Sequence, residues 1–241
     1  MKRNIDGVGE VTTPSGAKEK IQNFWYHYKL HTALALLLVV AIVVCSLQLC
    51  TRESYDAHVL YAGSRNIGRT AKDGDVAEIV TVISSLKRIA DDFDENGDIS
   101  LDLSSLYYLD GSEAANADAA TQALLANDRS TLSSLLEHSE YYLCFISVAV
   151  YESYHGVDSA ERFIDLTGYR SESSDLKYYS DSAIYLSSTE AYKLPGLSSL
   201  PDDTLICIRQ PSILGAKSKS HMLHFENAKK MLENILKLDI K

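Results

Sequence analysis

Apolar residues are concentrated first in one long run near the beginning of the chain. Residues 32–50 form nineteen consecutive positions without a charged side chain. A helix of that length measures about 28 Å, close to the thickness of a bilayer's hydrocarbon core. The rest of the chain is too small to surround so uniformly apolar a helix, which argues against a buried core helix. The pattern therefore predicts a transmembrane helix over residues 30–51.

Beyond this run, the pattern changes to short apolar stretches that are typical of alternating strands and helices. It predicts strands over residues 57–62, 99–103, 141–151, 184–186 and 205–208, and helices over residues 76–90, 114–126, 130–138, 158–166 and 221–237. The stretch at 141–151 is apolar throughout, which predicts a central strand buried on both faces. Strands separated by helices predict an α/β domain with a mixed or parallel sheet covered by helices.

The residues on either side of the apolar run give it an orientation. Phe24–Tyr28 are mostly aromatic, as in the belt that transmembrane helices place at the membrane interface, and Lys18, Lys20 and Lys29 lie on the same side. The positive-inside rule then places the N-terminus in the cytoplasm. We expect a cytoplasmic tail and juxtamembrane segment at 1–29, the span at 30–51, and an extracytoplasmic α/β domain at 52–241.

A cleaved signal peptide is the main alternative to a retained anchor. Its basic region would be unusually long, its apolar region too long, and no A-x-A cleavage site follows. A lipoprotein site at Cys50 is disfavoured because the large Leu49 precedes the cysteine. The sequence therefore favours an uncleaved anchor in the cell membrane.

Charge is distributed unevenly between the two parts of the chain. Residues 1–52 contain six Lys/Arg and three Asp/Glu, whereas residues 53–241 contain seventeen and thirty, so that the whole chain has a net charge of −10. An acidic domain repels nucleic acid and favours cations or basic partners. Solubility alone also explains much of this charge. We expect no nucleic-acid partner, and a protein or small-molecule ligand outside the cell.

One acidic loop has the spacing of a calcium site. Asp92, Asp94, Asn96 and Asp98 surround Gly97 as do the first positions of an EF-hand-type loop. Ca²⁺ prefers several oxygen ligands, which a tight glycine turn can gather around one point. Position 12 is Leu103, so the usual bidentate glutamate is missing and we expect weak, structural calcium binding. The alternative is a solvated Asn-Gly turn without an ion.

Two resemblances accompany these patterns. The loop from Asp92 to Ser100 resembles the calcium loops of EF-hand and dockerin proteins. The motif Phe24-Trp25-Tyr26-His27-Tyr28-Lys29, followed by a single span and an α/β domain, resembles uncharacterised single-pass membrane-anchored proteins of Gram-positive bacteria. That second resemblance implies a location in the cell envelope but no activity.

The remaining reactive residues suggest no catalytic arrangement. His221 and His224 are three positions apart on a predicted helix, and without an evident third ligand they are interpreted as a surface pair. Cys144 and Cys207 lie in apolar strands, where either a disulfide or two buried thiols would fit. We therefore expect a membrane-anchored cell-surface binding or structural module, stabilised by calcium. An extracytoplasmic enzyme, hydrolytic in type, is the alternative.

Overall fold

The computed structural model describes residues 16–50, 55–68, 76–154, 162–171 and 176–238. Its contacts divide the chain into two compact units, Met1–Glu53 and Ser54–Lys241. Residues 1–15 of the predicted cytoplasmic tail lie outside the described ranges.

The first unit consists of one long helix, α1 (Ala17–Cys50). Its segment Phe24–Ser46 has 23 residues and a mean hydropathy of 2.2, and none of it is buried within the structure. Of the residues described, this is the one helix long and apolar enough to cross a membrane, a property that a signal sequence shares. The predicted N-terminal apolar helix is thus confirmed, although it begins earlier than residue 30 and includes the aromatic residues 24–28.

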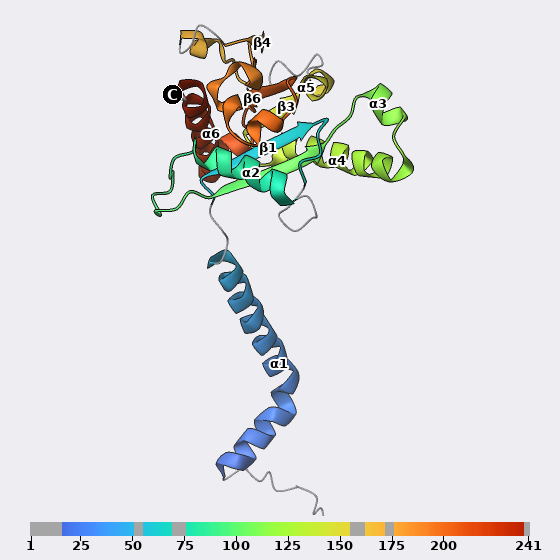
Figure 1. Cartoon of the computed structure of the whole chain (residues 1–241). Helices are drawn as coiled ribbons and strands as arrows, with labels where there is room; N and C mark the ends of the chain where they lie inside the picture. Colours follow the sequence, from blue (N-terminus) through green and yellow to red (C-terminus); the bar gives the residue numbers. More distant parts are fainter. Residues whose placement is uncertain (1–15, 51–54, 69–75, 155–161, 172–175, 239–241) are drawn as a thin grey trace, which may run out of the picture. The chain divides into compact units, whose positions relative to one another are not determined.

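The second unit is built on a six-stranded mixed sheet with the strand order β2-β1-β3-β6-β5-β4 (Figure 1). The strands are β1 (Ala57–Gly63), β2 (Leu101–Tyr107), β3 (Leu143–Ser147), β4 (Tyr178–Ser180), β5 (Ala183–Tyr185) and β6 (Thr204–Ile208). β1 pairs in parallel with β2 and with β3, whereas β6 runs antiparallel to both β3 and β5. The predicted α/β fold with a mixed sheet is therefore confirmed.

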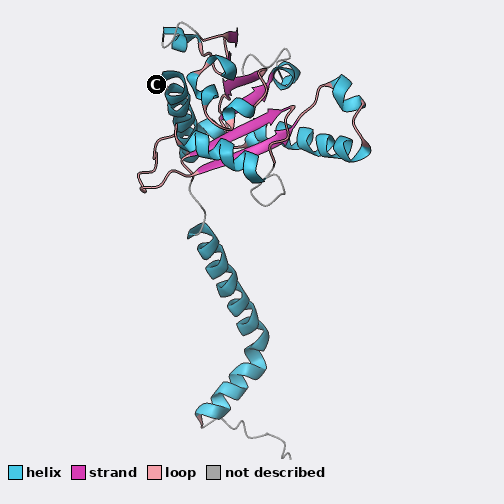
Figure 2. Cartoon of the chain, in the orientation of Figure 1, coloured by secondary structure: helices cyan, strands magenta, loops and turns pink. Residues whose placement is uncertain are grey.

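Helices cover both faces of this sheet (Figure 2). Alternate residues of β1 belong to different cores, as a strand's two-residue period requires. Val59 and Tyr61 pack with α2 (Val76–Lys87) and α6 (Lys219–Lys237), whereas Leu60 and Ala62 pack with α4 (Ala119–His138) and α5 (Val148–Tyr154). The sheet is thus the middle of three layers.

The predicted central strand at 141–151 is too long. β3 ends at Ser147, and Val148 begins helix α5, so the second half of the apolar run is helical. The Ser147 side-chain oxygen accepts a hydrogen bond from the backbone N–H of Val150 at 3.3 Å, as an N-cap does. A capping serine within an apolar run marks the point where the backbone changes from strand to helix.

Smaller differences concern the other elements. The predicted helices at 114–126 and 130–138 are replaced by a short helix α3 (Gly111–Ala115) and the continuous α4, whose first turn is capped by Asp118. β4 was not predicted. Of the predicted helix at 158–166, residues 158–161 lie outside the described ranges, and residues 162–166 are not helical.

Candidate metal centre

Three histidines and a glutamate meet at the edge of the sheet where the parallel strands begin. His58 is the second residue of β1 and lies in register with Asp102, the second residue of β2. Glu140 precedes β3, in the connection that follows α4. His221 and His224 come from the first turns of α6. The cluster therefore combines segments that are far apart in the sequence.

The side chains of His58, His224 and Glu140 each direct one atom toward a common point. His58 Nε2 lies 3.8 Å from Glu140 Oε2, and His224 Nε2 lies 3.6 Å from the same oxygen. One ligand atom from each of the three residues lies within 4.8 Å of the others. The rings of His58 and His224 are nearly perpendicular, with centroids 4.7 Å apart. Two imidazole nitrogens and one carboxylate oxygen thus converge.

The orientation of His58 is fixed by Asp102. His58 Nδ1 lies 3.1 Å from Asp102 Oδ2, and the Tyr141 hydroxyl donates a 2.6 Å hydrogen bond to that oxygen. Burial alone would raise the pKa of Asp102, but the hydrogen bonds from His58 and Tyr141 outweigh it and hold the pKa below its usual value. An ionised carboxylate only accepts hydrogen bonds, so Nδ1 of His58 is the donor to Asp102 and Nε2 is the nitrogen that faces Glu140.

His221 lies beside the other carboxylate oxygen of Glu140. Its Nε2 lies 3.8 Å from Glu140 Oε1, and its Nδ1 lies 2.9 Å from the Tyr142 hydroxyl. The imidazole is therefore held from both sides. His221 is not one of the three residues whose ligand atoms all lie within 4.8 Å of one another.

A buried arginine holds the backbone that presents Glu140. Arg209 follows β6 and is 3 % exposed. Its guanidinium donates hydrogen bonds to the carbonyl oxygens of Leu136, Ser139 and Tyr141, and it lies over the Tyr142 ring at 4.5 Å. Because these carbonyls lie on both sides of Glu140, the arginine restricts the position of that side chain.

Helix α6 is held in place by its packing and by one buried amide. Its apolar stripe packs against the sheet through Phe225, Ala228, Met231, Leu232, Ile235 and Leu236. Asn227 donates a 2.9 Å hydrogen bond to the backbone oxygen of Asp56, two residues before His58. This contact joins the helix that carries His224 to the beginning of the strand that carries His58.

The donor set is of the type that binds zinc. Zn²⁺ takes imidazole nitrogen and carboxylate oxygen at about 2.0–2.2 Å, which corresponds to about 3.3 Å between neighbouring ligands in a tetrahedron. The distances of 3.6 and 3.8 Å from the two imidazole nitrogens to Glu140 Oε2 are a few tenths of an ångström longer than this value. The hydrogen bond that His58 donates to Asp102 matches the carboxylate–histidine pairing found behind many ligating imidazoles.

The acidic loop forms a second group of carboxylates. Ligand atoms of Asp92 and Asp94 lie within 4.8 Å of each other and of the buried Asp56. Asp56 Oδ1 accepts hydrogen bonds from the backbone N–H groups of Phe93 and Asp94 at 2.7 and 3.2 Å. Its Oδ2 accepts from Ser100 N at 2.8 Å. Asp56, which the sequence reasoning missed, therefore anchors the whole loop.

The other predicted calcium ligands have different positions. Asn96 donates to Asp94 Oδ2 at 2.8 Å through its side-chain amide and accepts from Asp98 N with its oxygen. Asp98 is exposed and is not part of the carboxylate group. Gly97 has a φ of +90°, which supports the predicted glycine turn. The predicted residues Asp92 and Asp94 are thus brought together, while Asp98 is not.

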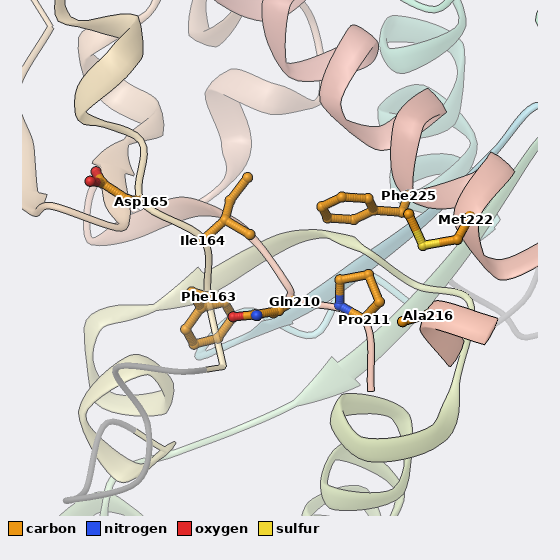
Figure 3. Close-up of a pocket in the computed structure, with 8 residues that line it drawn as sticks. All are labelled: Phe163, Ile164, Asp165, Gln210, Pro211, Ala216, Met222 and Phe225. Carbon is orange, nitrogen blue, oxygen red and sulfur yellow. The ribbon is translucent and has the colours of Figure 1, made fainter. Parts of the chain in front are cut away.

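A cavity of about 450 Å³ lies beside the N-terminal half of α6 (Figure 3). It is lined by Phe163, Ile164, Asp165, Gln210, Pro211, Ala216, Met222 and Phe225. In Figure 3 the carboxylate of Asp165 is directed away from the other lining side chains. The converging residues His58, Glu140 and His224 do not line this cavity, so it is separate from the cluster.

Cys144 and Cys207 occupy paired positions on β3 and β6 and are free thiols. Of the two alternatives that the sequence left open, the structure has buried thiols. Burial raises the pKa of the Cys144 thiol to about 12 and that of Cys207 well above its ordinary value.

The sequence interpretation of His221 and His224 as a surface pair is wrong. The missing partners are Glu140 and His58, which are distant in sequence and come from a loop and a strand. The pair spacing was the only sequence signal for this site. No family model, curated protein or solved structure matches the chain. The resemblance to membrane-anchored proteins of Gram-positive bacteria therefore stays a prediction.

Proposed function

We propose that this chain is a single-pass membrane protein whose extracytoplasmic α/β domain binds zinc at His58, Glu140 and His224. The observation that carries the zinc proposal is the convergence of His58 Nε2 and His224 Nε2 on one oxygen of Glu140. The length and hydropathy of Phe24–Ser46 support the anchor. The basic residues before this segment support a cytoplasmic N-terminus.

The choice of zinc follows from the donor atoms. Two imidazoles and a carboxylate suit zinc better than magnesium or calcium, which prefer oxygen ligands alone. The proposed function is thus that of an extracytoplasmic binding domain, and the molecule that it binds is a zinc ion.

Zinc content of the purified full chain in detergent tests this proposal. His27 and His31 of α1 are replaced by alanine in every sample, so that bound zinc reports on the second unit. We expect one zinc per chain, and we expect His224→Ala and His58→Ala each to lose tight binding. His138→Ala is the matched control, because this histidine on α4 has a side chain 77 % exposed and lies outside the group. A chain without zinc, or a His224→Ala variant with full zinc content, would contradict the proposal.

A calcium ion at the acidic loop is a second, separate proposal. It is supported by the proximity of the carboxylates of Asp56, Asp92 and Asp94. Calcium bound there would link the loop to the start of β1 and would therefore be structural. Without a glutamate at position 12, we expect affinity near the millimolar end of the range.

Thermal unfolding with and without calcium tests this second site. Calcium at ten times its dissociation constant would stabilise the fold by about 1.4 kcal/mol and raise the melting temperature. We expect the double replacement Asp92→Ala with Asp94→Ala to abolish this rise. Asp98→Ala is the matched control and should retain it, because that side chain lies outside the carboxylate group. If several millimolar calcium leaves the melting temperature unchanged, the loop is a solvated turn.

A further inference from the structure

The number of converging donors separates two kinds of zinc site. Structural zinc sites are closed by four protein ligands, whereas catalytic sites have three protein ligands and a water molecule in the fourth position. Among the described residues, the group that contains histidine has three members whose ligand atoms lie within 4.8 Å of one another: His58, Glu140 and His224. Two histidines with one glutamate is a three-ligand combination found in zinc hydrolases.

The position of His221 distinguishes it from a fourth ligand. His58 and His224 both point to Glu140 Oε2, whereas His221 Nε2 points to Oε1 at 3.8 Å. A metal bound through Oε2 would therefore have His221 behind the carboxylate. Ligating carboxylates are commonly oriented by such outer contacts. The Tyr142 hydroxyl, 2.9 Å from His221 Nδ1, holds this imidazole in that position.

The cluster is also partly exposed to solvent. The side chains of His58, His224 and Glu140 are 12 %, 15 % and 20 % exposed. The core residues of the neighbouring strands, by contrast, are almost completely buried. This partial exposure supports a fourth ligand that exchanges with solvent.

We propose that the zinc site has an open coordination position that takes an exogenous oxyanion, a carboxylate or a phosphate, in place of water. This inference rests on the proposed zinc binding and adds the class of ligand. His221 is a positioning residue that acts through Glu140. An open position of this kind is what the alternative hydrolytic function would require.

Cobalt substitution of the full chain in detergent tests the open position, because the visible absorption of Co²⁺ depends on its ligands. The probes are acetate, inorganic phosphate and acetohydroxamate, added separately to the cobalt-loaded protein. We expect at least one probe to shift the absorption bands with a saturable dependence on its concentration. The separate acetate and phosphate titrations show which oxyanion the site prefers.

Variants of His221 provide the decisive comparison. We expect His221→Gln and His221→Ala to bind cobalt about 10- to 100-fold more weakly, which is the usual loss when a residue that orients a metal ligand is replaced. We expect the absorption bands of both variants still to respond to the probes. If the wild-type bands respond to no probe while those of His221→Ala do, His221 is the fourth ligand and the open position is refuted. Bands that respond to no probe in either protein also refute it. Absence of any cobalt binding would instead overturn the proposed zinc function.

Discussion

At the scale of single residues, the candidate centre depends on side chains that are not themselves ligands. Asp102 determines which nitrogen of His58 carries the proton, and Arg209 fixes the backbone around Glu140. Neither role could be predicted from the sequence. Asp102 lay within the predicted strand at 99–103, and Arg209 followed the predicted strand at 205–208, with no sign of a partner for either residue. Their contacts exist only because the sheet brings β1, β2 and the α4–β3 connection together.

Replacement of Asp102 by asparagine should weaken metal binding without removing a ligand. The amide can donate as well as accept, so it no longer selects the His58 tautomer with a free Nε2. We expect zinc affinity to fall about 10- to 100-fold, measured by competition with a chelator of known affinity. Asp181→Asn is the control, because Asp181 is an exposed carboxylate paired with Arg170. If the Asp102→Asn variant binds zinc as tightly as the wild type, Asp102 does not contribute to the metal site.

The two buried cysteines should be unreactive in the native protein. Burial raises the pKa of the Cys144 thiol to about 12, so at pH 8 almost none of it is the reactive thiolate. The experiment uses a Cys45→Ser, Cys50→Ser background with a thiol-reactive chromophore. We expect no modification of folded protein and two equivalents after unfolding. Rapid native reaction would show that the β3–β6 pair is accessible, and two missing thiols after unfolding would indicate a disulfide.

At the scale of elements, the sequence pattern predicted best the elements with a distinct apolar pattern and a clear end. The helix at 221–237 and the strand at 57–62 were predicted within one or two residues, because the helix has an apolar stripe and the strand is a short apolar run that ends at Gly63. The prediction failed where an apolar run contains two elements, as at β3 and α5. Periodicity cannot divide such a run, and the division depends on the capping contact of Ser147 with Val150.

Gly196 is an element-scale feature whose replacement should be severe. It has a φ of +84°, and a Cβ atom there would lie 2.7 Å from the backbone nitrogen of Val82 in α2. We expect Gly196→Ala to lower the free energy of unfolding by more than about 2 kcal/mol, measured in urea. Gly97 also has a positive φ, +90°, but no close neighbour, and Gly97→Ala should cost about 1 kcal/mol. Similar losses for both variants would mean that α2 moves to accommodate the new methyl group.

At the scale of the whole molecule, composition and charge predicted the division into an apolar helix and an acidic domain. The α/β class followed from the alternation of strand and helix patterns. The metal cluster could not be predicted from the sequence, because His58 and Glu140 are 82 positions apart and Glu140 and His224 are another 84 positions apart. Spacing rules recognise ligands that are neighbours in sequence. They cannot recognise a group that forms only when three segments meet.

Retention of the apolar helix in the mature protein is the whole-molecule prediction. We expect the intact mass of the chain extracted from membranes to include residues 24–46, because no small-residue cleavage site follows the segment. Protease added to wall-free cells should digest the Ser54–Lys241 unit while sparing a cytoplasmic marker protein. A mature chain beginning near Thr51 would identify the helix as a signal sequence. Full protection of the second unit would reverse the proposed topology.

A metal ion bound by the three converging residues would also act as a cross-link in the chain. A metal ion shared by His58, Glu140 and His224 would close two loops of more than eighty residues each. By the loop-entropy relation for cross-links, one closure of this size restricts the unfolded chain by about 4.5 kcal/mol. The ion would thus fasten the first strand of the domain to its last helix. Force applied through residue 57 would then have to break metal–ligand bonds before β1 could separate from α6.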